Sequence, residues 1–388
     1  MYYYHCLNPI AQVGLGLFTD VYSPATDEKG ADAILVRSAS MLESEFGEEL
    51  KAIARAGAGV NNIPLDRASE NGIVVFNTPG ANANGVKELV IAALLLASRD
   101  IVGGIEWVHE NINDADIAKS AEKAKKAFAG NELYGKKLGV IGLGAIGILV
   151  ANSGVALGMD VLGYDPYLSV DSAWQLSRSI RHAKALEDIF KECDYITLHI
   201  PANEETIGMI GKKAIELMKT GTVVLNFSRS TLVDEDEMVA ALESGHIKHY
   251  VSDFPTTTTA GAKGAIVIPH LGASTEESED NCAKMAVNQL RDFLENGNIK
   301  NSVNFPNCDM GILGTGKTRV LLLHRNIPNM IGQFTGILTQ ENLNIADMAN
   351  KNKGAYACTI IDIDSQIPDD LAEKLRAVDG VVRVRIIS

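Results

Sequence analysis

Short apolar runs alternate with helix-like segments along the first hundred residues. Residues 33–36 and 73–76 each form an unbroken apolar run of the length typical of a buried strand. Residues 43–56 have apolar positions at helical spacing, and residues 88–97 follow the asparagines at 82 and 84 as a capped helix would. Strands that alternate with helices predict βαβ units and a parallel sheet.

A second alternating series follows a polar segment. Residues 111–130 are rich in Ala, Lys, Asp and Glu, which indicates a solvated helix or a connector. Beyond them we expect a helix at 145–156 and strands at 138–141, 160–164, 194–198, 222–225 and 264–269. This pattern predicts a second doubly wound sheet.

The last seventy residues have a different order. Residues 301–317 contain three Gly, a Pro and three Asn and are expected to form a linker. Strands are then expected at 320–323, 345–349, 357–363 and 381–387, with helices at 329–340 and 368–378. The order βαββαβ is that of a ferredoxin-like domain. The predicted fold class is α/β, with two Rossmann-like parallel-sheet domains and a ferredoxin-like domain at the carboxyl end.

Composition narrows the class of protein. The 388 residues are 46% hydrophobic and 22% charged, as expected of globular domains, and the net charge of −14 argues against binding to nucleic acid or to an anionic membrane. Five scattered cysteines without a C-x-x-C pair favour a reducing compartment and predict neither disulfides nor a metal site. No signal peptide or membrane-spanning run is apparent, so we expect a cytoplasmic protein.

A glycine motif joins the second predicted sheet to its helix. Gly142, Gly144 and Gly147, with Ala145 and Ile146 between them, follow a strand and open a helix, as in dinucleotide-binding turns. The helix amino terminus would face a pyrophosphate. Asp165, at the end of the next strand, would bind a ribose 2′-hydroxyl and repel a 2′-phosphate, so the motif favours NAD over NADP. The alternative is a strand–helix turn without a ligand.

Two further side chains follow strands of the same sheet. Arg229 comes after the strand at 222–225, and His270 comes after the apolar residues 266–268. Ligands of open α/β sheets bind beyond the carboxyl ends of the strands. Histidine can take the hydroxyl proton of an alcohol as hydride leaves, and a guanidinium can grip a neighbouring carboxylate. The alternatives are a loop salt bridge for Arg229 and a capping role for His270.

These motifs together resemble the NAD-dependent D-2-hydroxyacid dehydrogenases. The resemblance rests on residues 142–147, Asp165, 226–234 and 269–275, and residues 36–39 and 54–63 are similar to the phosphoglycerate dehydrogenase branch. It implies a substrate-binding domain formed by residues 1–98 and 283–310, an NAD-binding domain at 99–282, and a regulatory ACT domain at 318–388. Effector sites of ACT domains usually lie between subunits, so a homo-oligomer, dimer or tetramer, is implied.

The resemblance also implies roles for particular residues. Arg229 would bind the substrate carboxylate and carbonyl, and His270 would be the acid–base. The residues implied to hold the rest of the substrate are Arg37, Ser38, Arg55, Ala58, Gly59, Val60 and Asn61. Those implied to line the cofactor site are Pro201, Thr206, Phe227, Ser228, Asp253 and Gly272. The positions that match an effector site for L-serine are His324, Asn326 and Asn344, for which the alternative is ordinary polar residues at strand ends and turns.

The chain departs from the family pattern at two places. The family usually has a glutamate shortly after the position of Asp253, paired with the catalytic histidine, whereas here four threonines follow Pro255. Either His270 takes up its proton less readily than in relatives, or it uses another acid such as Asp253. Asn61 stands where the family usually has an aspartate, which leaves that turn one charge less negative.

The expected reaction is NAD-dependent oxidation of 3-phospho-D-glycerate to 3-phosphohydroxypyruvate, the first step of L-serine biosynthesis, with L-serine as a possible effector. The alternatives are a reductase of hydroxypyruvate, glyoxylate or another 2-keto acid, and a non-catalytic protein that binds NADH.

Overall fold

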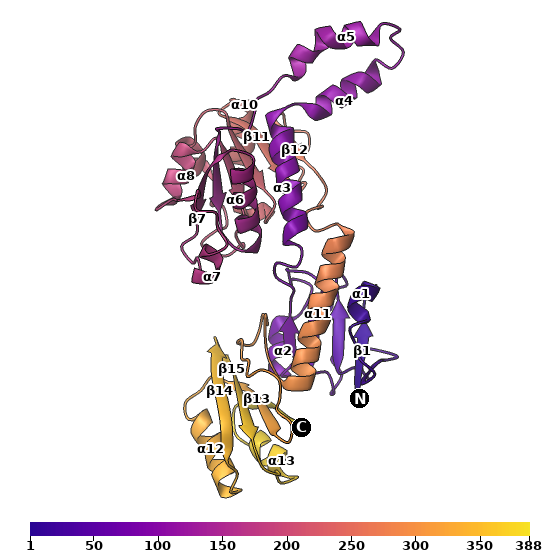
Figure 1. The fold of residues 1–388 in the computed structure, drawn as a ribbon, viewed down its shortest axis with the longest axis vertical. Helices are drawn as coiled ribbons and strands as arrows, with labels where there is room; N and C mark the ends of the chain where they lie inside the picture. The colour runs from indigo at the N-terminus through magenta and orange to yellow at the C-terminus, as the bar shows by residue number, and fades with distance from the viewer. The chain divides into compact units, whose positions relative to one another are not determined.

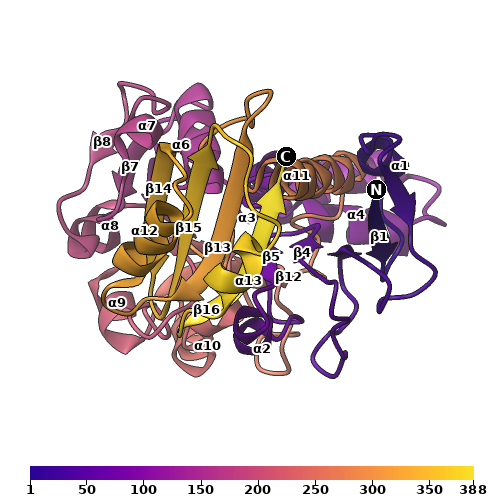
Figure 2. The same cartoon turned by 90° about the horizontal axis from the view of Figure 1, so that it is seen from below.

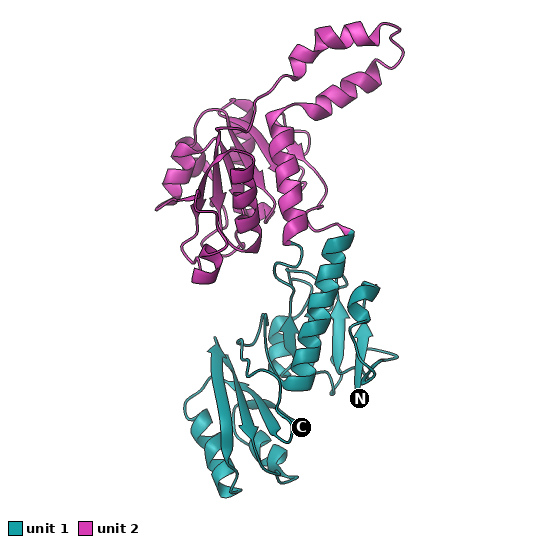
Figure 3. Cartoon of the chain, in the orientation of Figure 1, with its two compact units in different colours: residues 1–82, 276–388 teal, residues 83–275 magenta.

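A computed structural model describes all residues, 1–388. The chain forms two compact units (Figure 3). Unit 1 contains residues 1–82 and 276–388, and unit 2 contains residues 83–275. No helix is long and apolar enough to cross a membrane.

The amino-terminal part of unit 1 is built on a five-stranded parallel sheet with the order β2-β1-β3-β4-β5 (Figure 1). Its strands are β1 (Tyr2–Cys6), β2 (Tyr22–Pro24), β3 (Ala33–Val36), β4 (Ala52–Arg55) and β5 (Val74–Phe76). This is the flavodoxin-like strand order. Helices α1 (Gln12–Leu15) and α11 (Glu276–Asn296) share one apolar core with one face of the sheet, and α2 (Leu65–Glu70) belongs to the core on the other face.

The helix predicted at residues 43–56 is wrong. No helix forms there, and Ala52–Arg55 is the interior strand β4, which lies between β3 and β5 and is mostly buried. A strand inside a parallel sheet is apolar on both faces, so the spacing of its apolar residues does not distinguish a strand from a helix. The prediction, which relied on that spacing, was therefore wrong. The strand predictions at 33–36 and 73–76 are confirmed, because β3 and β5 occupy those positions.

Unit 2 is built on a seven-stranded parallel sheet with the order β12-β11-β10-β9-β6-β7-β8. The strands are β6 (Lys137–Ile141), β7 (Asp160–Tyr164), β8 (Arg181–His182), β9 (Tyr195–Leu198), β10 (Thr222–Asn226), β11 (Ile247–Ser252) and β12 (Ala265–Val267). The order of the first strands is that of a dinucleotide-binding sheet, with the switch point between β6 and β9. Separate apolar cores cover its two faces.

Helices of unit 2 pack on this sheet or project from it. Those around the sheet are α3 (Ala83–Ser98), α6 (Ala145–Ala156), α7 (Val170–Ala173), α8 (Leu186–Glu192), α9 (Lys212–Leu217) and α10 (Glu235–Glu243), with a 3₁₀ turn at Ser230–Leu232. Helices α4 (Ile101–Glu110) and α5 (Ile117–Ala124), followed by a 3₁₀ turn at Lys125–Phe128, form an arm that projects from the unit (Figure 1). No residue of α4 or α5 is buried. For α5 this agrees with the solvated segment predicted at residues 111–130.

The border between the units differs from the expected domain borders at 98/99 and 282/283. The units divide at 82/83 and 275/276, which places all of α3 in unit 2 and all of α11 in unit 1. The reason is packing, because Val86, Val90 and Leu94 of α3 belong to the core that also contains Leu138 and Val140 of β6. An uninterrupted helix stays with the sheet on which its apolar face packs.

The carboxyl-terminal residues form the predicted βαββαβ arrangement. The elements are β13 (Thr318–Arg325), α12 (Met330–Gln340), β14 (Ile345–Lys353), β15 (Tyr356–Ile363), α13 (Leu371–Arg376) and β16 (Val381–Ile387). The antiparallel sheet has the order β14-β15-β13-β16. Figure 2 views it from the side that carries α12 and α13.

This sheet is covered on both faces, so it belongs to unit 1 rather than forming a separate unit. Along β13, Val320 and Leu322 face the core under α12 and α13. Leu321 and Leu323 belong instead to the core formed with α11 and the amino-terminal sheet. The two-residue period of a strand divides these side chains between the two faces.

Arginines of the carboxyl-terminal sheet bind the carbonyl groups at the end of α11. Arg385 donates to the carbonyl oxygens of Phe293 at 3.0 Å and Leu294 at 2.8 Å, and its guanidinium lies over the Phe293 ring. Burial lowers the pKa of Arg385 to about 10. Arg383 donates instead to the carbonyl oxygens of Leu50 and of Asn71, and Asn71 is the residue at the carboxyl end of α2. Positive charge is favourable at a helix carboxyl terminus, where carbonyl groups lack helical partners.

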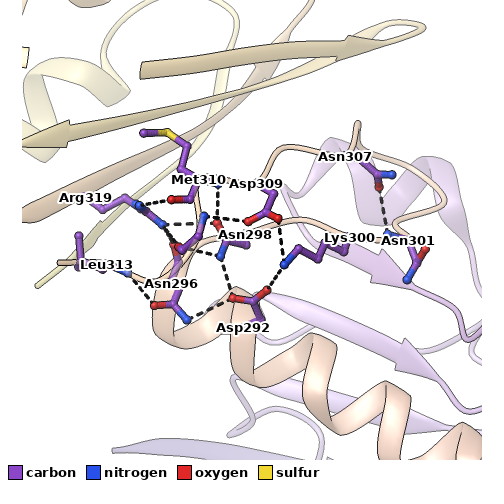
Figure 4. Close-up of polar contacts among 11 residues, drawn as sticks. Asp292, Asn296, Asn298, Lys300, Asn301, Asn307, Asp309, Met310, Leu313 and Arg319 are labelled. Atoms are coloured by element: carbon purple, nitrogen blue, oxygen red, sulfur yellow. Dashed lines mark hydrogen bonds and ion pairs between the residues drawn. The ribbon is translucent and has the colours of Figure 1, made fainter. Parts of the chain in front are cut away.

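Arg319 is the centre of the polar contacts that hold the segment between α11 and β13 (Figure 4). It is fully buried and pairs with Asp362 through two hydrogen bonds of 2.6 and 2.9 Å. It also donates to the carbonyl oxygens of Asn296 and Gly311 at 2.8 Å. The expected linker is therefore fixed in place by a buried cation.

Replacing Arg319 should destabilise unit 1 strongly. Arg319→Met leaves Asp362 buried without its cation, and breaking such a pair costs about 3–5 kcal/mol. The matched control is Lys300→Met, because Lys300 forms ion pairs with Asp292 and Asp309 in the same cluster but is half exposed. That control should cost less than about 1 kcal/mol. The measurement is the free energy of unfolding in urea, and equal losses for the two variants would contradict the prediction.

Candidate active site

The glycine motif forms a tight turn between β6 and α6. Gly142 has a φ of +90°, in the left-handed region that favours glycine, and its N–H donates to the carbonyl oxygen of Tyr164. A Cβ at Gly142 would overlap the carbonyl oxygen of His199, and a Cβ at Gly147 would overlap that of Gly142. These two glycines are required by close backbone packing within the turn itself.

Gly144 is different, because a Cβ placed there meets no atom within 4 Å. It is the N-cap residue of α6, is exposed, and offers no side chain to the first N–H groups of the helix, among them those of Ala145 and Ile146. Open space over uncapped N–H groups at the positive end of a helix suits an anionic group. These residues therefore fit the pyrophosphate of a dinucleotide.

Asp165 lies at the end of β7, beside this turn. One carboxylate oxygen accepts the N–H of Leu143 at 2.8 Å and the other accepts the N–H of Tyr167 at 2.8 Å. The carboxylate is partly exposed. An oxygen with two acceptor positions can still take a ribose hydroxyl while it holds the turn.

Arg229 stands in the loop after β10, and buried residues hold that loop. Asn226, which is fully buried, donates to the carbonyl oxygen of Arg229 at 2.9 Å and lies 3.3 Å from the Tyr250 hydroxyl. Its own oxygen accepts the N–H of Ser228, whose hydroxyl donates to the carbonyl oxygen of Leu198. The Arg229 side chain is exposed and bends back to the carbonyl oxygen of Ser228 at 2.6 Å.

His270 is exposed in the turn after β12. Its imidazole lies 4.8 Å from the Phe254 ring, centroid to centroid. Asp253, the residue before Phe254, is buried and accepts the N–H of Gly272 at 2.9 Å. The loop after β11 therefore contacts the His270 turn through both a ring and a carboxylate.

The remaining cofactor candidates lie at the carboxyl ends of β9 and β10. Thr206 is partly exposed and donates to the carbonyl oxygen of Pro201 at 2.7 Å, which closes the loop after β9. Phe227 is buried in the core beneath β10. Along one edge of the unit 2 sheet the structure thus places the glycine turn, Arg229 and the candidates that line the cofactor site.

In unit 1 the substrate candidates gather at the carboxyl ends of the neighbouring strands β3 and β4. The Nε of Arg55 donates to the carbonyl oxygen of Arg37 at 3.1 Å. Asn62 donates to the carbonyl oxygen of Ala39, and Asn77 donates to that of Ala58. These bonds join the turn at 37–39 to the turn of Ala58, Gly59, Val60 and Asn61.

The Arg37 guanidinium forms an ion pair of 2.5 Å with Glu279 of α11, and both side chains are partly exposed. The backbone N–H groups of Arg37, Ser38 and Ala39 all donate to the side-chain oxygen of Asn8, at 2.9–3.1 Å. The backbone position of Arg37 is therefore fixed by Asn8, while its guanidinium, though paired with Glu279, remains partly exposed to solvent.

Sequence reasoning missed the residues that position these groups. Asn8, Asn62 and Asn77 bind backbone atoms of the turns in unit 1. In unit 2, Asn226 binds the backbone of the Arg229 loop, and the Tyr250 hydroxyl accepts a hydrogen bond from the Asn226 side chain. Asn226 immediately precedes the loop and could have been noticed as a polar residue that ends an apolar strand. The others lie far from their partners in the sequence and carry no local signal.

The three effector candidates are in unlike surroundings. His324 is buried, with one ring nitrogen 2.9 Å from the Thr359 hydroxyl and the other 2.8 Å from the carbonyl oxygen of Arg325. Burial lowers the pKa of His324, which favours the neutral imidazole. Asn326 and Asn344 are exposed, and Asn326 donates to the carbonyl oxygen of Gly354 at 3.1 Å.

The open space at Gly144 can be tested by adding one methyl group. Gly144→Ala should leave the melting temperature unchanged, because φ is −79° and no atom is displaced. It should weaken NADH binding about tenfold or more, since the methyl group occupies the space through which the backbone approaches the pyrophosphate. The control is Gly336→Ala in α12, where a Cβ also meets open space. Unchanged NADH affinity in a fluorescence titration of Gly144→Ala would contradict this prediction.

Comparison with known proteins identifies the family to which this chain is similar. Residues 91–272 match the model of the D-isomer specific 2-hydroxyacid dehydrogenase, NAD binding domain. A D-3-phosphoglycerate dehydrogenase of Methanocaldococcus jannaschii is 36% identical over 76% of this chain and 56% of the relative. One of Escherichia coli is 31% identical over 88% of this chain and 82% of the relative.

A solved structure supports the same assignment. The NAD⁺-bound 3-phosphoglycerate dehydrogenase of Entamoeba histolytica has a TM-score of 0.60 and 27% identity, over 78% of this chain and 98% of that chain. The match to the M. jannaschii relative spans little more than half of that relative's length. The chain belongs to the D-isomer specific 2-hydroxyacid dehydrogenase family, and unit 2 is its NAD-binding domain.

Proposed function

We propose that this protein oxidises 3-phospho-D-glycerate to 3-phosphohydroxypyruvate with NAD, at the entry to L-serine biosynthesis. The observation that carries the proposal is the carboxyl edge of the unit 2 sheet. There the uncapped turn at Gly144, the guanidinium of Arg229 and the imidazole of His270 all follow parallel strands. The relatives named D-3-phosphoglycerate dehydrogenase support the choice of substrate.

The chemistry divides between the cofactor and these side chains. NAD, when bound, supplies the hydride acceptor. Arg229 binds the substrate carboxylate and stabilises negative charge on the oxygen that becomes the carbonyl. His270 takes the hydroxyl proton in oxidation and returns it in reduction. Asp165 favours NAD over NADP, because a carboxylate accepts a ribose hydroxyl and repels a phosphate.

The phosphate of the substrate is assigned to unit 1. Arg37 and Arg55 stand on neighbouring strands beside the turn of Ala58, Gly59, Val60 and Asn61. A guanidinium suits phosphate through paired hydrogen bonds. Glu279 now holds Arg37, so the phosphate would have to exchange with that carboxylate.

The carboxyl-terminal domain is proposed to bind L-serine through Asn326 and Asn344, whose side chains are exposed. His324 would support the end of β13 from beneath. A homo-oligomer is proposed to form through α4, which buries none of its apolar residues, Ile105 at 52% exposure among them. Exposed apolar surface of this kind is typical of subunit contacts.

The proposed reaction is tested by following NADH oxidation with 3-phosphohydroxypyruvate, with and without L-serine. Turnover that serine suppresses is the expected result. Turnover that serine leaves unchanged would keep the reaction and remove the effector. Activity on glyoxylate or hydroxypyruvate alone would favour the broader reductase. NADH binding without turnover of any keto acid would favour a binding protein.

The phosphate assignment is tested by Arg55→Met. Loss of one charged hydrogen-bond donor, worth about 1.5–3 kcal/mol, should raise KM for 3-phosphohydroxypyruvate about tenfold to a hundredfold. The same variant should change KM for hydroxypyruvate little, and this unphosphorylated analogue is the internal control. Equal effects on both substrates would show that Arg55 has only a structural role.

A further inference from the structure

The acid–base chemistry proposed for His270 leaves one charge without a partner. When the imidazole takes the hydroxyl proton it becomes a cation, and a nearby carboxylate is the usual means of stabilising it. The loop after β11 reads Asp-Phe-Pro-Thr-Thr-Thr-Thr from Asp253 to Thr259 and has no glutamate. Another carboxylate of unit 2 must supply the negative charge if the reaction runs through His270.

Asp253 is placed beside the His270 turn. It is 1% exposed, and one of its oxygens accepts the N–H of Gly272, two residues after His270, at 2.9 Å. Its other oxygen is buried and has no hydrogen-bond partner. The next residue, Phe254, contacts the His270 ring. The carboxylate and the imidazole are thus held by the same two short segments.

The electrostatics of this carboxyl group agree with that placement. Burial raises the pKa of Asp253, while the N–H of Gly272 and the positive charge of His270 lower it. Burying a carboxylate that has an oxygen without a hydrogen-bond partner lowers the free energy of unfolding, and a cation beside the carboxylate reduces this loss. A positive charge on His270 therefore reduces the free-energy cost of burying the Asp253 carboxylate.

Glu235 is the other carboxylate near this loop. One of its oxygens accepts the Thr256 hydroxyl at 2.5 Å, and the other is buried without a partner. Its charge, like that of Asp253, raises the pKa of the Tyr250 hydroxyl, for which burial is the larger cause. It makes no hydrogen bond to residues 270–272, whereas Asp253 does. Asp253 is the better placed of the two.

We propose that Asp253 is the positioning carboxylate of His270 and takes the place of the missing glutamate. The inference rests on the proposed function. In oxidation the hydroxyl proton moves to an imidazole nitrogen, and the C–H electron pair leaves as hydride to NAD. Asp253 keeps its negative charge throughout, stabilises the imidazolium, and fixes the turn through Gly272.

The test compares Asp253→Asn with the wild type. Asparagine keeps an oxygen for the N–H of Gly272 but removes the charge. We expect kcat for 3-phosphohydroxypyruvate reduction to fall about tenfold to a hundredfold near pH 7.5, within the range of acid–base catalysis, with KM for NADH unchanged. The pH of half-maximal NAD reduction should move about one unit lower, because imidazolium without its carboxylate loses its proton more easily. Thr257→Glu in the same variant should restore both.

Two readouts do not depend on turnover. The NMR titration midpoint of the His270 ring should be lower in Asp253→Asn than in the wild type. The melting temperature at neutral pH should be higher in the variant. The folded pKa of Asp253 is raised, so the folded protein binds this proton more tightly than the unfolded chain and loses that stabilisation as pH rises. The stability difference should therefore vanish at acidic pH.

The matched control is Glu235→Gln, which removes the neighbouring, partly exposed carboxylate and should leave the His270 midpoint unchanged. Identical midpoints in the wild type and Asp253→Asn would overturn the proposal. So would a shift in Glu235→Gln alone, or a variant of Asp253 that only raises KM for NADH, as a cofactor-lining residue would. If the wild type turns over no keto acid, the proposed function fails, while the NMR titration still decides whether Asp253 and His270 are coupled.

Discussion

A helix that ends inside a protein must have its last carbonyl groups hydrogen-bonded, and in α11 the carboxyl-terminal sheet supplies those bonds. Arg385 binds the carbonyl oxygens of Phe293 and Leu294, and Arg319 binds that of Asn296. Without these hydrogen bonds, the carbonyl groups at the helix end and the guanidinium groups of the two arginines would lose partners that they have in the interior. This mutual dependence explains why the carboxyl-terminal sheet and the amino-terminal sheet form one unit.

The same helix begins at the substrate candidates. Glu279, in its first turn, pairs with Arg37, and Gln289 farther along binds the carbonyl oxygen of Asn77, whose side chain holds Ala58. One helix of twenty-one residues thus contacts both Arg37, proposed to bind phosphate, and the domain proposed to bind an effector. In unit 2 the corresponding constraint is electrostatic, since the buried carboxylate of Asp253 lies against the turn that carries His270.

Local patterns predicted most of this fold because each pattern has a local physical cause. The helix at Ala145–Ala156 and the strand at Asp160–Tyr164 occupy the predicted residues, since a glycine turn and an unbroken apolar run specify them. The prediction failed at 43–56, where the strand Ala52–Arg55 is mostly buried and its spacing does not distinguish strand from helix. The two compact units divide at 82/83 and 275/276, because such a border depends on which sheet a helix covers.

The sequence by itself determined the two parallel-sheet halves, the ferredoxin-like end, the dinucleotide turn and the strand ends that carry Arg229 and His270. These follow from periodicity and from glycine positions, which act over a few residues. Tertiary structure alone decided that Asp253 is buried beside Gly272, that Glu279 pairs with Arg37, and that His324 is enclosed rather than exposed. Such contacts join residues that are not neighbours in the sequence, and only the folded backbone sets the distances between their polar groups.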